Sequence, residues 1–241
     1  MNGTHYNSSH SYKDFNLLRT APKKISPPQI KSNLIDNPGG NGKIDLSTSH
    51  TGVPLYNDRI ITESFMIPFA QKRSEHILSE IYRILDGEKA QIWFDEQPDY
   101  YWVGKPMVKN VDKSNDTHLK IDIESEVFPF KYERFSSLDD WEWDYLNFET
   151  GIIREYKDIY IDGECYVEII GTKMPSIPKF HLSDVTAEIS VAYYDAALDR
   201  TALVNLSQKE DTSDIIIREG LCRLHFYGVG YVSIEYRGGI L

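Results

Sequence analysis

Two strand-like runs interrupted by proline set the strongest limits on how this chain folds. The first, FDEQPDYYWVG, spans residues 94–104, and the second, VFPFKYE, spans residues 127–133. Proline fixes its own backbone angle and has no N–H to donate to a strand ladder, so Pro98 and Pro129 mark places where strands begin or end. The first run therefore predicts an acidic turn between two strands, and the second predicts a strand that ends at its proline.

Length and composition indicate a folded protein of one large domain or two ordinary ones. The chain has 241 residues, of which 41% are hydrophobic and 26% charged. No stretch approaches the ~20 consecutive apolar residues that a membrane helix needs. The first residues lack the charged and then apolar pattern of a signal peptide, so we expect neither membrane insertion nor export.

The charges divide the chain into two unequal parts. Residues 1–134 carry 17 Lys and Arg against 18 Asp and Glu, a formal net charge of −1. Residues 135–241 carry 9 against 19, a net charge of −10. We therefore expect an N-terminal domain of residues 1–134 and a C-terminal domain of residues 135–241. Such an acidic chain is not expected to bind nucleic acid, which needs clustered cations.

The first domain is predicted to be α+β. Residues 1–50 indicate short strands and an extended arm, with a turn at residues 38–44. Apolar residues at helical spacing predict one helix over residues 74–86, which Gly87 ends. Alternating apolar residues predict strands over residues 59–68, 90–93, 100–111 and 119–127. A helix on one face of the sheet is the simplest packing of these elements.

The second domain shows no helical pattern. Seven or eight short apolar runs are separated by Gly, Pro, Asp and Ser, which is typical of a β-sandwich. The predicted strands are 159–161, 165–170, 186–194, 202–206, 215–217, 221–227 and 232–236. The fold class is thus mainly β with one helix, an α+β domain followed by a sandwich.

None of the candidate chemical motifs predicts a reaction centre. The run PGGNGKI at residues 38–44 lacks the first glycine and the Ser or Thr of a phosphate-binding loop, so a hairpin turn is the better interpretation. Asp95, Glu96 and Asp99 could suggest a hydrolase pair or a calcium loop. Nothing predicts the burial that a general acid needs or the regular oxygen ligands of a calcium loop, and a solvated turn is favoured.

The histidines and cysteines also lack the spacing of a site. Seven histidines are scattered without an H-x-x-x-H or H-x-x-E pair. Cys222 and His225 are three residues apart on a predicted strand, which places them on opposite faces. We therefore predict no catalytic residues, no metal ligands and no cofactor.

One aromatic strand is a candidate binding surface. Trp141, Trp143 and Tyr145 alternate with acidic residues. Alternating aromatic side chains most often form the inner face of a sandwich, but they can also stack on sugar rings or contact a partner protein. Both interpretations stay open at this point.

The chain resembles the distal tail proteins (Dit) of long-tailed, non-contractile bacteriophages. The resemblance rests on the DYYWVG hairpin at residues 99–104 and the PFKY strand at residues 129–132. The opening residues 1–5 and 14–17 and the closing segment 218–239 are similar to the family pattern as well. Asn16 stands where the family usually has glycine, and asparagine tolerates the left-handed backbone that such a position needs.

The resemblance implies a structural virion protein, not an enzyme. It implies that the N-terminal domain forms a hexameric ring, either single or stacked in pairs, that joins the tail tube to the baseplate at the distal end of the tail. It implies a galectin-like C-terminal sandwich that docks other proteins. The implied partners are the major tail tube protein, the tape-measure protein, the tail-associated lysin or baseplate hub protein, and receptor-binding or adhesion proteins.

Expected contacts and rival functions complete the interpretation. We expect the turn formed by Asp95, Glu96, Asp99, Tyr100 and Tyr101 to lie at a ring or partner interface. Assembly would take place in the host cytoplasm. A carbohydrate-binding module that engages cell-wall glycans through the second domain is the main alternative, and a glycan-degrading enzyme is a more remote one.

Overall fold

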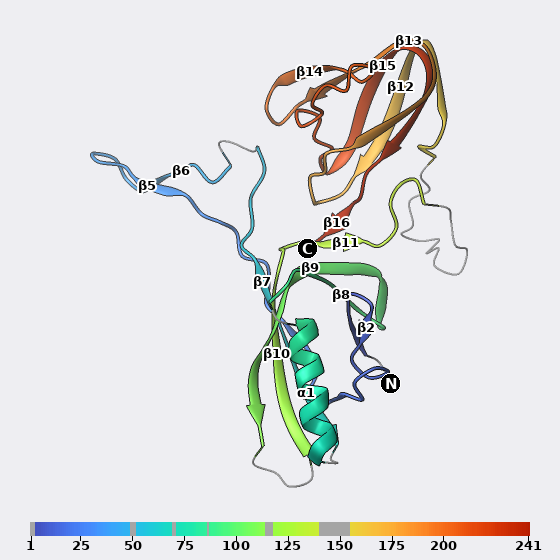
Figure 1. Ribbon diagram of the computed structural model, residues 1–241. Coiled ribbons are helices and arrows are strands. Elements are labelled where there is room, and N and C mark those ends of the chain that lie inside the picture. Colours follow the sequence, from blue (N-terminus) through green and yellow to red (C-terminus); the bar gives the residue numbers. More distant parts are fainter. Residues whose placement is uncertain (1–2, 49–51, 69–70, 86, 114–117, 140–154) are drawn as a thin grey trace. The chain divides into compact units, whose positions relative to one another are not determined.

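The computed structural model describes residues 3–48, 52–68, 71–85, 87–113, 118–139 and 155–241 (Figure 1). The chain divides into two compact units, residues 1–43 with 54–131, and residues 44–53 with 132–241. Each unit has a hydrophobic core of its own. That residue 134 separates two functional domains stays a prediction.

The first unit is built on a curled antiparallel sheet with the strand order β2-β1-β8-β9-β10-β7-β3. The pairing of β10 with β7 is continuous, from His118 opposite Pro68 to Val127 opposite Arg59. β4 (Lys24–Ile25) also pairs with β7. The strands of the path are β1 (Thr4–Tyr6), β2 (Ser9–His10), β3 (Leu18–Arg19), β7 (Arg59–Pro68), β8 (Ala90–Phe94), β9 (Gln97–Asp112) and β10 (His118–Val127).

The two proline-containing runs fold much as expected. Phe94 pairs with Gln97, so Asp95 and Glu96 form the turn between β8 and β9. Pro98 lies inside the first residues of β9 instead of ahead of the strand, a position where a missing N–H is tolerated. β10 ends at Val127, two residues before Pro129.

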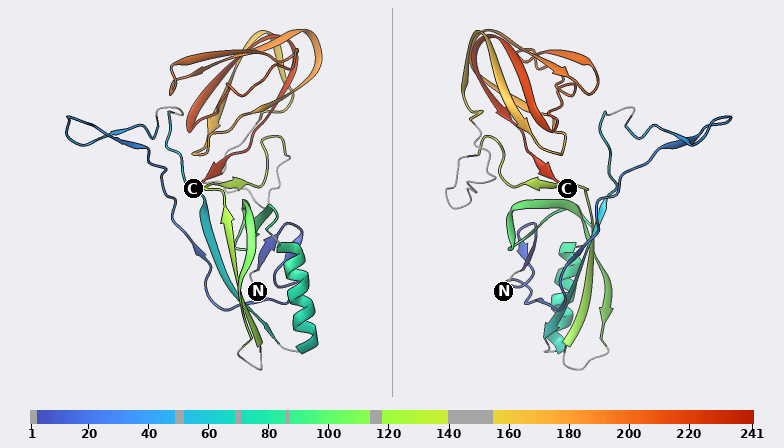
Figure 2. Two further views of the ribbon diagram at one scale, coloured as in Figure 1. Left: turned by 60° about the vertical axis from the view of Figure 1, so that its left-hand side comes forward. Right: turned by 180° about the vertical axis from the view of Figure 1, so that it is seen from behind.

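Helix α1 (Gln71–Leu85) lies along one face of this sheet, as both views of Figure 2 show. Its apolar residues recur every three or four positions, so one side of the helix packs into the core. These residues are Ile77, Leu78, Ile81, Ile84 and Leu85. Gly87 has a φ of 71° and donates its N–H to the Leu85 carbonyl at 2.7 Å, which ends the helix. The helix and its glycine stop are confirmed.

A hairpin arm lies between β4 and β7. Its strands β5 (Leu34–Asp36) and β6 (Lys43–Asp45) form a separate two-stranded sheet. Gly39 and Gly42 have φ values of 100° and 79°, which only glycine adopts without strain, and they allow the chain to reverse. The turn predicted for residues 38–44 is confirmed.

The second unit is built on four long strands in the order β12-β15-β13-β14. β11 (Lys131–Glu133) and β16 (Gly239–Ile240) pair with each other but belong to the ten-stranded sheet, not to these four strands. The long strands are β12 (Ile159–Gly171), β13 (Lys179–Asp195), β14 (Arg200–Asn205) and β15 (Gly220–Glu235). This differs from the seven or eight short strands predicted: residues 159–161 and 165–170 belong to one strand, as do 221–227 and 232–236. Ile215–Ile217 forms no strand, only an isolated bridge from Ile217 to Ser176.

The strands are long because they bend without breaking. Phe180 of β13 pairs with Ile234 of β15, whereas Phe226 belongs to β15 itself and pairs with Val191. Ile234 and Phe226 are eight residues apart on β15. A straight strand would separate such positions by about 26 Å. Their rings nevertheless lie 5.9 Å apart. The sheet therefore folds back on itself, and its two halves form the layers of the sandwich.

A row of glycines allows this bend. Gly163 pairs with Gly228, and Gly230 pairs with Ile161 on the neighbouring strand. All three glycines have positive φ, and β13 has register shifts beside them. A Cβ on Gly228 would lie 2.2 Å from the Glu188 carbonyl oxygen. The predicted fold class, mainly β with one helix, is confirmed.

We predict that Gly228→Ala lowers the free energy of unfolding by about 3 kcal/mol, because it adds backbone strain at φ +123° and a steric overlap with Glu188. Gly163→Ala is the matched control: it has φ +81° and no atom within 4 Å of the added methyl group. It should cost only about 1 kcal/mol. Urea unfolding measures both, and equal losses would contradict the role given to close packing at the bend.

Candidate functional site

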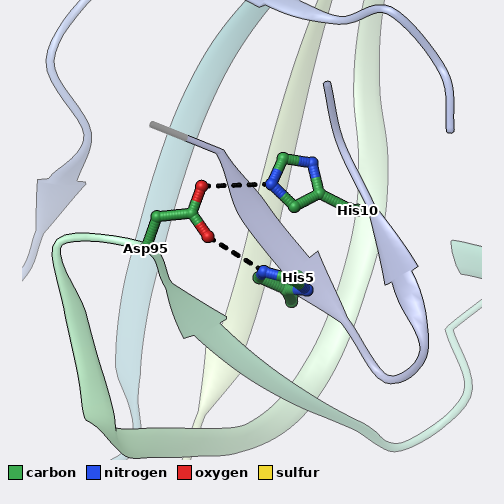
Figure 3. A group of neighbouring side chains, drawn as sticks. All are labelled: His5, His10 and Asp95. Carbon is green, nitrogen blue, oxygen red and sulfur yellow. Dashed lines mark hydrogen bonds and ion pairs between the residues drawn. The ribbon is translucent and has the colours of Figure 1, made fainter. Parts of the chain in front are cut away.

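The carboxylate of Asp95 joins the N-terminal hairpin to the turn between β8 and β9 (Figure 3). Its Oδ2 accepts the N–H of Gly3 at 2.7 Å and lies 3.1 Å from His10 Nε2. Its Oδ1 lies 2.9 Å from His5 Nε2. The His5 ring stacks on Trp93 with centroids 4.6 Å apart. The three side chains meet because β1 pairs with both β2 and β8.

Two histidines and a carboxylate with ligand atoms within 4.8 Å of one another could suggest a metal site. The hydrogen bonds of His10 argue against this. Its Nδ1 accepts the backbone N–H groups of Tyr12 and Lys13, both at 3.0 Å. The proton of a neutral His10 is therefore on Nε2, the atom that a metal would need unprotonated. The cluster fits a hydrogen-bonded clasp better than a metal centre.

The clasp holds Asp95 in its ionised form. Partial burial alone would raise the pKa of this carboxyl group, but hydrogen bonds from Gly3, His10 and His5 lower it to about 2. No local pattern in the sequence predicts this cluster. His5 and His10 are brought together with Asp95 only by strand pairing over 85 to 90 residues.

A second carboxylate, Glu63 of β7, is almost fully buried with 1% exposure. Its Oε1 accepts the hydroxyl of Thr4 at 2.5 Å and Arg19 Nη2 at 2.9 Å. Its Oε2 accepts the hydroxyl of Tyr6 at 2.7 Å. Burial, with the adjacent negative charge of Glu63, raises the pKa of Tyr6 well above its ordinary value, so the phenol stays a donor.

The Glu63 cluster connects strands that the sheet ladder does not. Thr4 and Tyr6 come from β1, near one end of the strand path, while Glu63 and Arg19 come from β7 and β3 at its other end. The curled sheet is thus closed by a buried ion pair and two hydroxyl donors. At its rim, Glu96 binds both Arg19 (3.1 Å) and Lys23.

The turn expected at an interface has mixed surroundings. Asp95 and Glu96 are engaged within their own chain, as described. Tyr101 is buried with 9% exposure, and Tyr100 is half-buried with its ring beneath Lys131. Asp99 is half-buried, and its Oδ1 has no hydrogen-bond partner within the described part of the chain. A role of this turn at an interface stays a prediction.

The other predicted contact residues, Trp141, Trp143 and Tyr145, lie outside the described residues. The second unit instead presents aromatic side chains on the outer face of its sheet. Tyr166 is 59% exposed, and its ring stacks on His225 with centroids 3.9 Å apart. The alternation of residues along β12 and β15 is the sequence pattern that could have predicted this exposed aromatic surface.

The hairpin arm carries apolar side chains that the described residues leave about half exposed. Leu34, Ile35 and Ile44 are 48%, 49% and 49% exposed, so both faces of the two-stranded sheet are open. Leu55, beyond the arm, is 45% exposed. Exposed apolar residues gathered on a two-sided hairpin are typical of a surface that another chain covers.

No family model and no curated protein matches this chain. Among solved structures, the chain is similar to the Dit protein (gp 19.1) of SPP1, described as a paradigm of the hub adsorption apparatus in phages that infect Gram-positive bacteria. The match has a TM-score of 0.61 and 9% identity and covers 100% of both chains. The two proteins share a fold, which confirms the resemblance at that level.

A second solved structure comes from the tail of an empty GTA particle. The match covers 44% of this chain and 75% of that one, with 14% identity. Its TM-score of 0.25 is too low to support any argument. No helix of the described residues is long and apolar enough to cross a membrane.

We predict that Glu63→Gln lowers the free energy of unfolding by about 3 kcal/mol, because it leaves Arg19 without its buried partner. Glu96→Gln removes the same charge from a carboxylate that is 42% exposed and should cost less than about 1 kcal/mol. Chemical denaturation of both variants tests this. Equal losses of stability in the two variants would mean that burial of Glu63 does not increase the contribution of its ion pair.

We predict that Asp95→Asn loses about 1 kcal/mol of stability at pH 6, after allowance for solvent screening of an exposed carboxylate. The folded pKa of about 2 lies below the ordinary unfolded value, so this stability is present above the unfolded pKa and disappears as pH falls through about 2. The difference between wild type and variant should therefore shrink between pH 4 and pH 2, approximately the interval bounded by the two pKa values. A difference that is constant over acid unfolding curves would contradict the clasp.

Proposed function

We propose that this protein is a structural component of the tail tip of a long-tailed phage, located at the distal end of the virion tail. The observation that carries the proposal is the fold shared along the whole chain with SPP1 Dit, which is described as part of a hub adsorption apparatus. We place its assembly in the host cytoplasm.

The proposed assembly is a hexameric ring that joins the tail tube to the baseplate. A ring needs an interface in which one surface of each copy meets a different surface of the next. The β5–β6 arm offers such a surface, because its apolar side chains are exposed and its two strands pair only with each other among the described residues. Burial of these side chains against a neighbouring copy would stabilise the ring.

The second unit is proposed to dock other proteins from the outside of the ring. Residues 135–241 carry a net charge of −10, so copies of this domain repel one another and stay apart. The proposed partners are the tail tube and tape-measure proteins, the tail-associated lysin or baseplate hub protein, and receptor-binding or adhesion proteins. The two carboxylate clusters of the first unit bind groups of their own chain, which supports a structural and non-enzymatic role.

Carbohydrate binding through the second unit is the alternative function. The exposed Tyr166 ring, stacked on His225, favours it, because a flat aromatic surface can stack on a sugar ring. His225 also lies 3.2 Å from Glu164 Oε2, which places a polar acceptor beside this platform. This alternative does not require a ring.

We predict that the triple variant Leu34→Ser, Ile35→Ser, Ile44→Ser dissociates the ring. Loss of three apolar contacts per interface removes about 3 kcal/mol, which raises the dissociation constant by about 100-fold. The unfolding midpoint of the monomer should not change, because these side chains are exposed in their own chain. Size-exclusion chromatography with light scattering measures the mass, and thermal unfolding measures the midpoint.

Leu203→Ser is the control, since Leu203 of β14 is 68% exposed in the second unit. It should leave the ring intact. A triple variant that still assembles would contradict the role of the arm. A wild type that stays monomeric at high concentration and binds cell-wall glycans would replace the ring with the alternative function.

A further inference from the structure

The first unit contains two partly buried cations that form no ion pair with any described residue. Arg59 of β7 is 8% exposed, and its Nε donates to the Ser26 carbonyl at 2.7 Å. Lys131 is half-buried and donates from Nζ to Gln97 Oε1 at 3.0 Å. Both partners are neutral oxygens, so neither positive charge is compensated.

Each of these cations lies over an aromatic ring of β9. The Arg59 guanidinium lies 4.8 Å from the centroid of Trp102, and the Lys131 ammonium lies 5.2 Å from that of Tyr100. Both aromatic residues belong to β9, and the positive charge of Arg59 acts on Lys131, so the two cations lie within electrostatic reach of each other.

The arrangement costs stability in the isolated chain. Burial lowers the pKa of Arg59, and burial together with the positive charge of Arg59 lowers the pKa of Lys131. Elsewhere in the same unit, partly buried cations have carboxylate partners: Arg19 binds Glu63. Aromatic rings attract cations, but they do not neutralise two like charges held close together.

We propose that Arg59 and Lys131 form a binding site for a carboxylate that a neighbouring copy of this chain supplies when the ring assembles. This inference rests on the proposed function. A second copy is a suitable source because the chain has 37 acidic residues against 26 basic ones and so offers carboxylates in excess. The first unit itself is formally neutral, with 16 Lys and Arg against 16 Asp and Glu in residues 1–43 and 54–131, so two cations without an acidic partner are available for a contact between subunits.

The test uses Lys131→Met, which removes the charge and keeps an apolar chain of similar length over Tyr100. Lys105→Met is the matched control, because Lys105 is an exposed cation of the same strand β9. The concentration for half-assembly should rise at least tenfold for Lys131→Met and stay unchanged for Lys105→Met. Light scattering over a dilution series measures it.

A second measurement separates this role from simple structural support. Under dilute conditions in which light scattering shows monomers, Lys131→Met should unfold at a temperature roughly 2–4 °C higher than wild type, since the repulsion from Arg59 is gone. A lower unfolding temperature, or unchanged assembly, would overturn the proposal.

A third experiment identifies the source of the carboxylate, and its result can be interpreted even if no ring forms. The unfolding temperature is compared in citrate and in sodium chloride at equal ionic strength. If citrate stabilises wild type but not Lys131→Met while the wild type never assembles, the site takes a free anion and the neighbouring copy is excluded as the source. If wild-type rings form, weaken with salt and require Lys131, the neighbouring copy is supported.

Discussion

The first unit depends on one buried carboxylate. A sheet of seven strands in a path has two ends, and in the described ranges of the chain no backbone ladder joins them. Glu63 closes the curl because Thr4 and Tyr6 reach it from β1 and Arg19 reaches it from β3. A buried charge without such donors would cost several kcal/mol, so the cluster stabilises only the closed arrangement. The hydrophobic core can therefore form inside a sheet that needs no strand ladder across its seam.

The sheet of the second unit is also curved, but its curvature has a different cause. Its strands are long, and positive φ angles at Gly163, Gly228 and Gly230 bend them until Phe180 and Phe226 meet. Backbone conformation, not a polar cluster, closes this layer. These two ways of curving a sheet depend differently on pH, because protonation weakens an ion pair but does not affect a bend at glycine. The second unit also contains one buried ion pair, between Asp195 and Arg218 at 2.7 Å, but the bend itself comes from the glycines.

Local sequence patterns predict where helices and strands form, but they do not predict which segments pair with one another. The period of α1 and the stop at Gly87 are local properties, and the sequence predicted both. The fusion of residues 159–161 with 165–170 was missed, because Gly163 reads locally as a turn although it pairs with Gly228 in a continuous ladder. The clasp of Asp95 was missed for a related reason: its histidines lie 85 to 90 residues away, and only strand pairing brings them near.

In the first unit, the main carboxylates have partners within the chain, whereas two cations have no acidic partner among the described residues. Its prominent carboxylates, Glu63 and Asp95, are compensated within the chain by hydrogen bonds and cations. Among the described residues, the cations Arg59 and Lys131 contact neutral oxygens and aromatic rings but no carboxylate. In the proposed assembly, the acidic residues of one copy, which outnumber the basic ones 37 to 26, are complementary to these two cations of the next copy. Association would then relieve a cost that folding alone leaves in place, which links the stability of the monomer to its assembly.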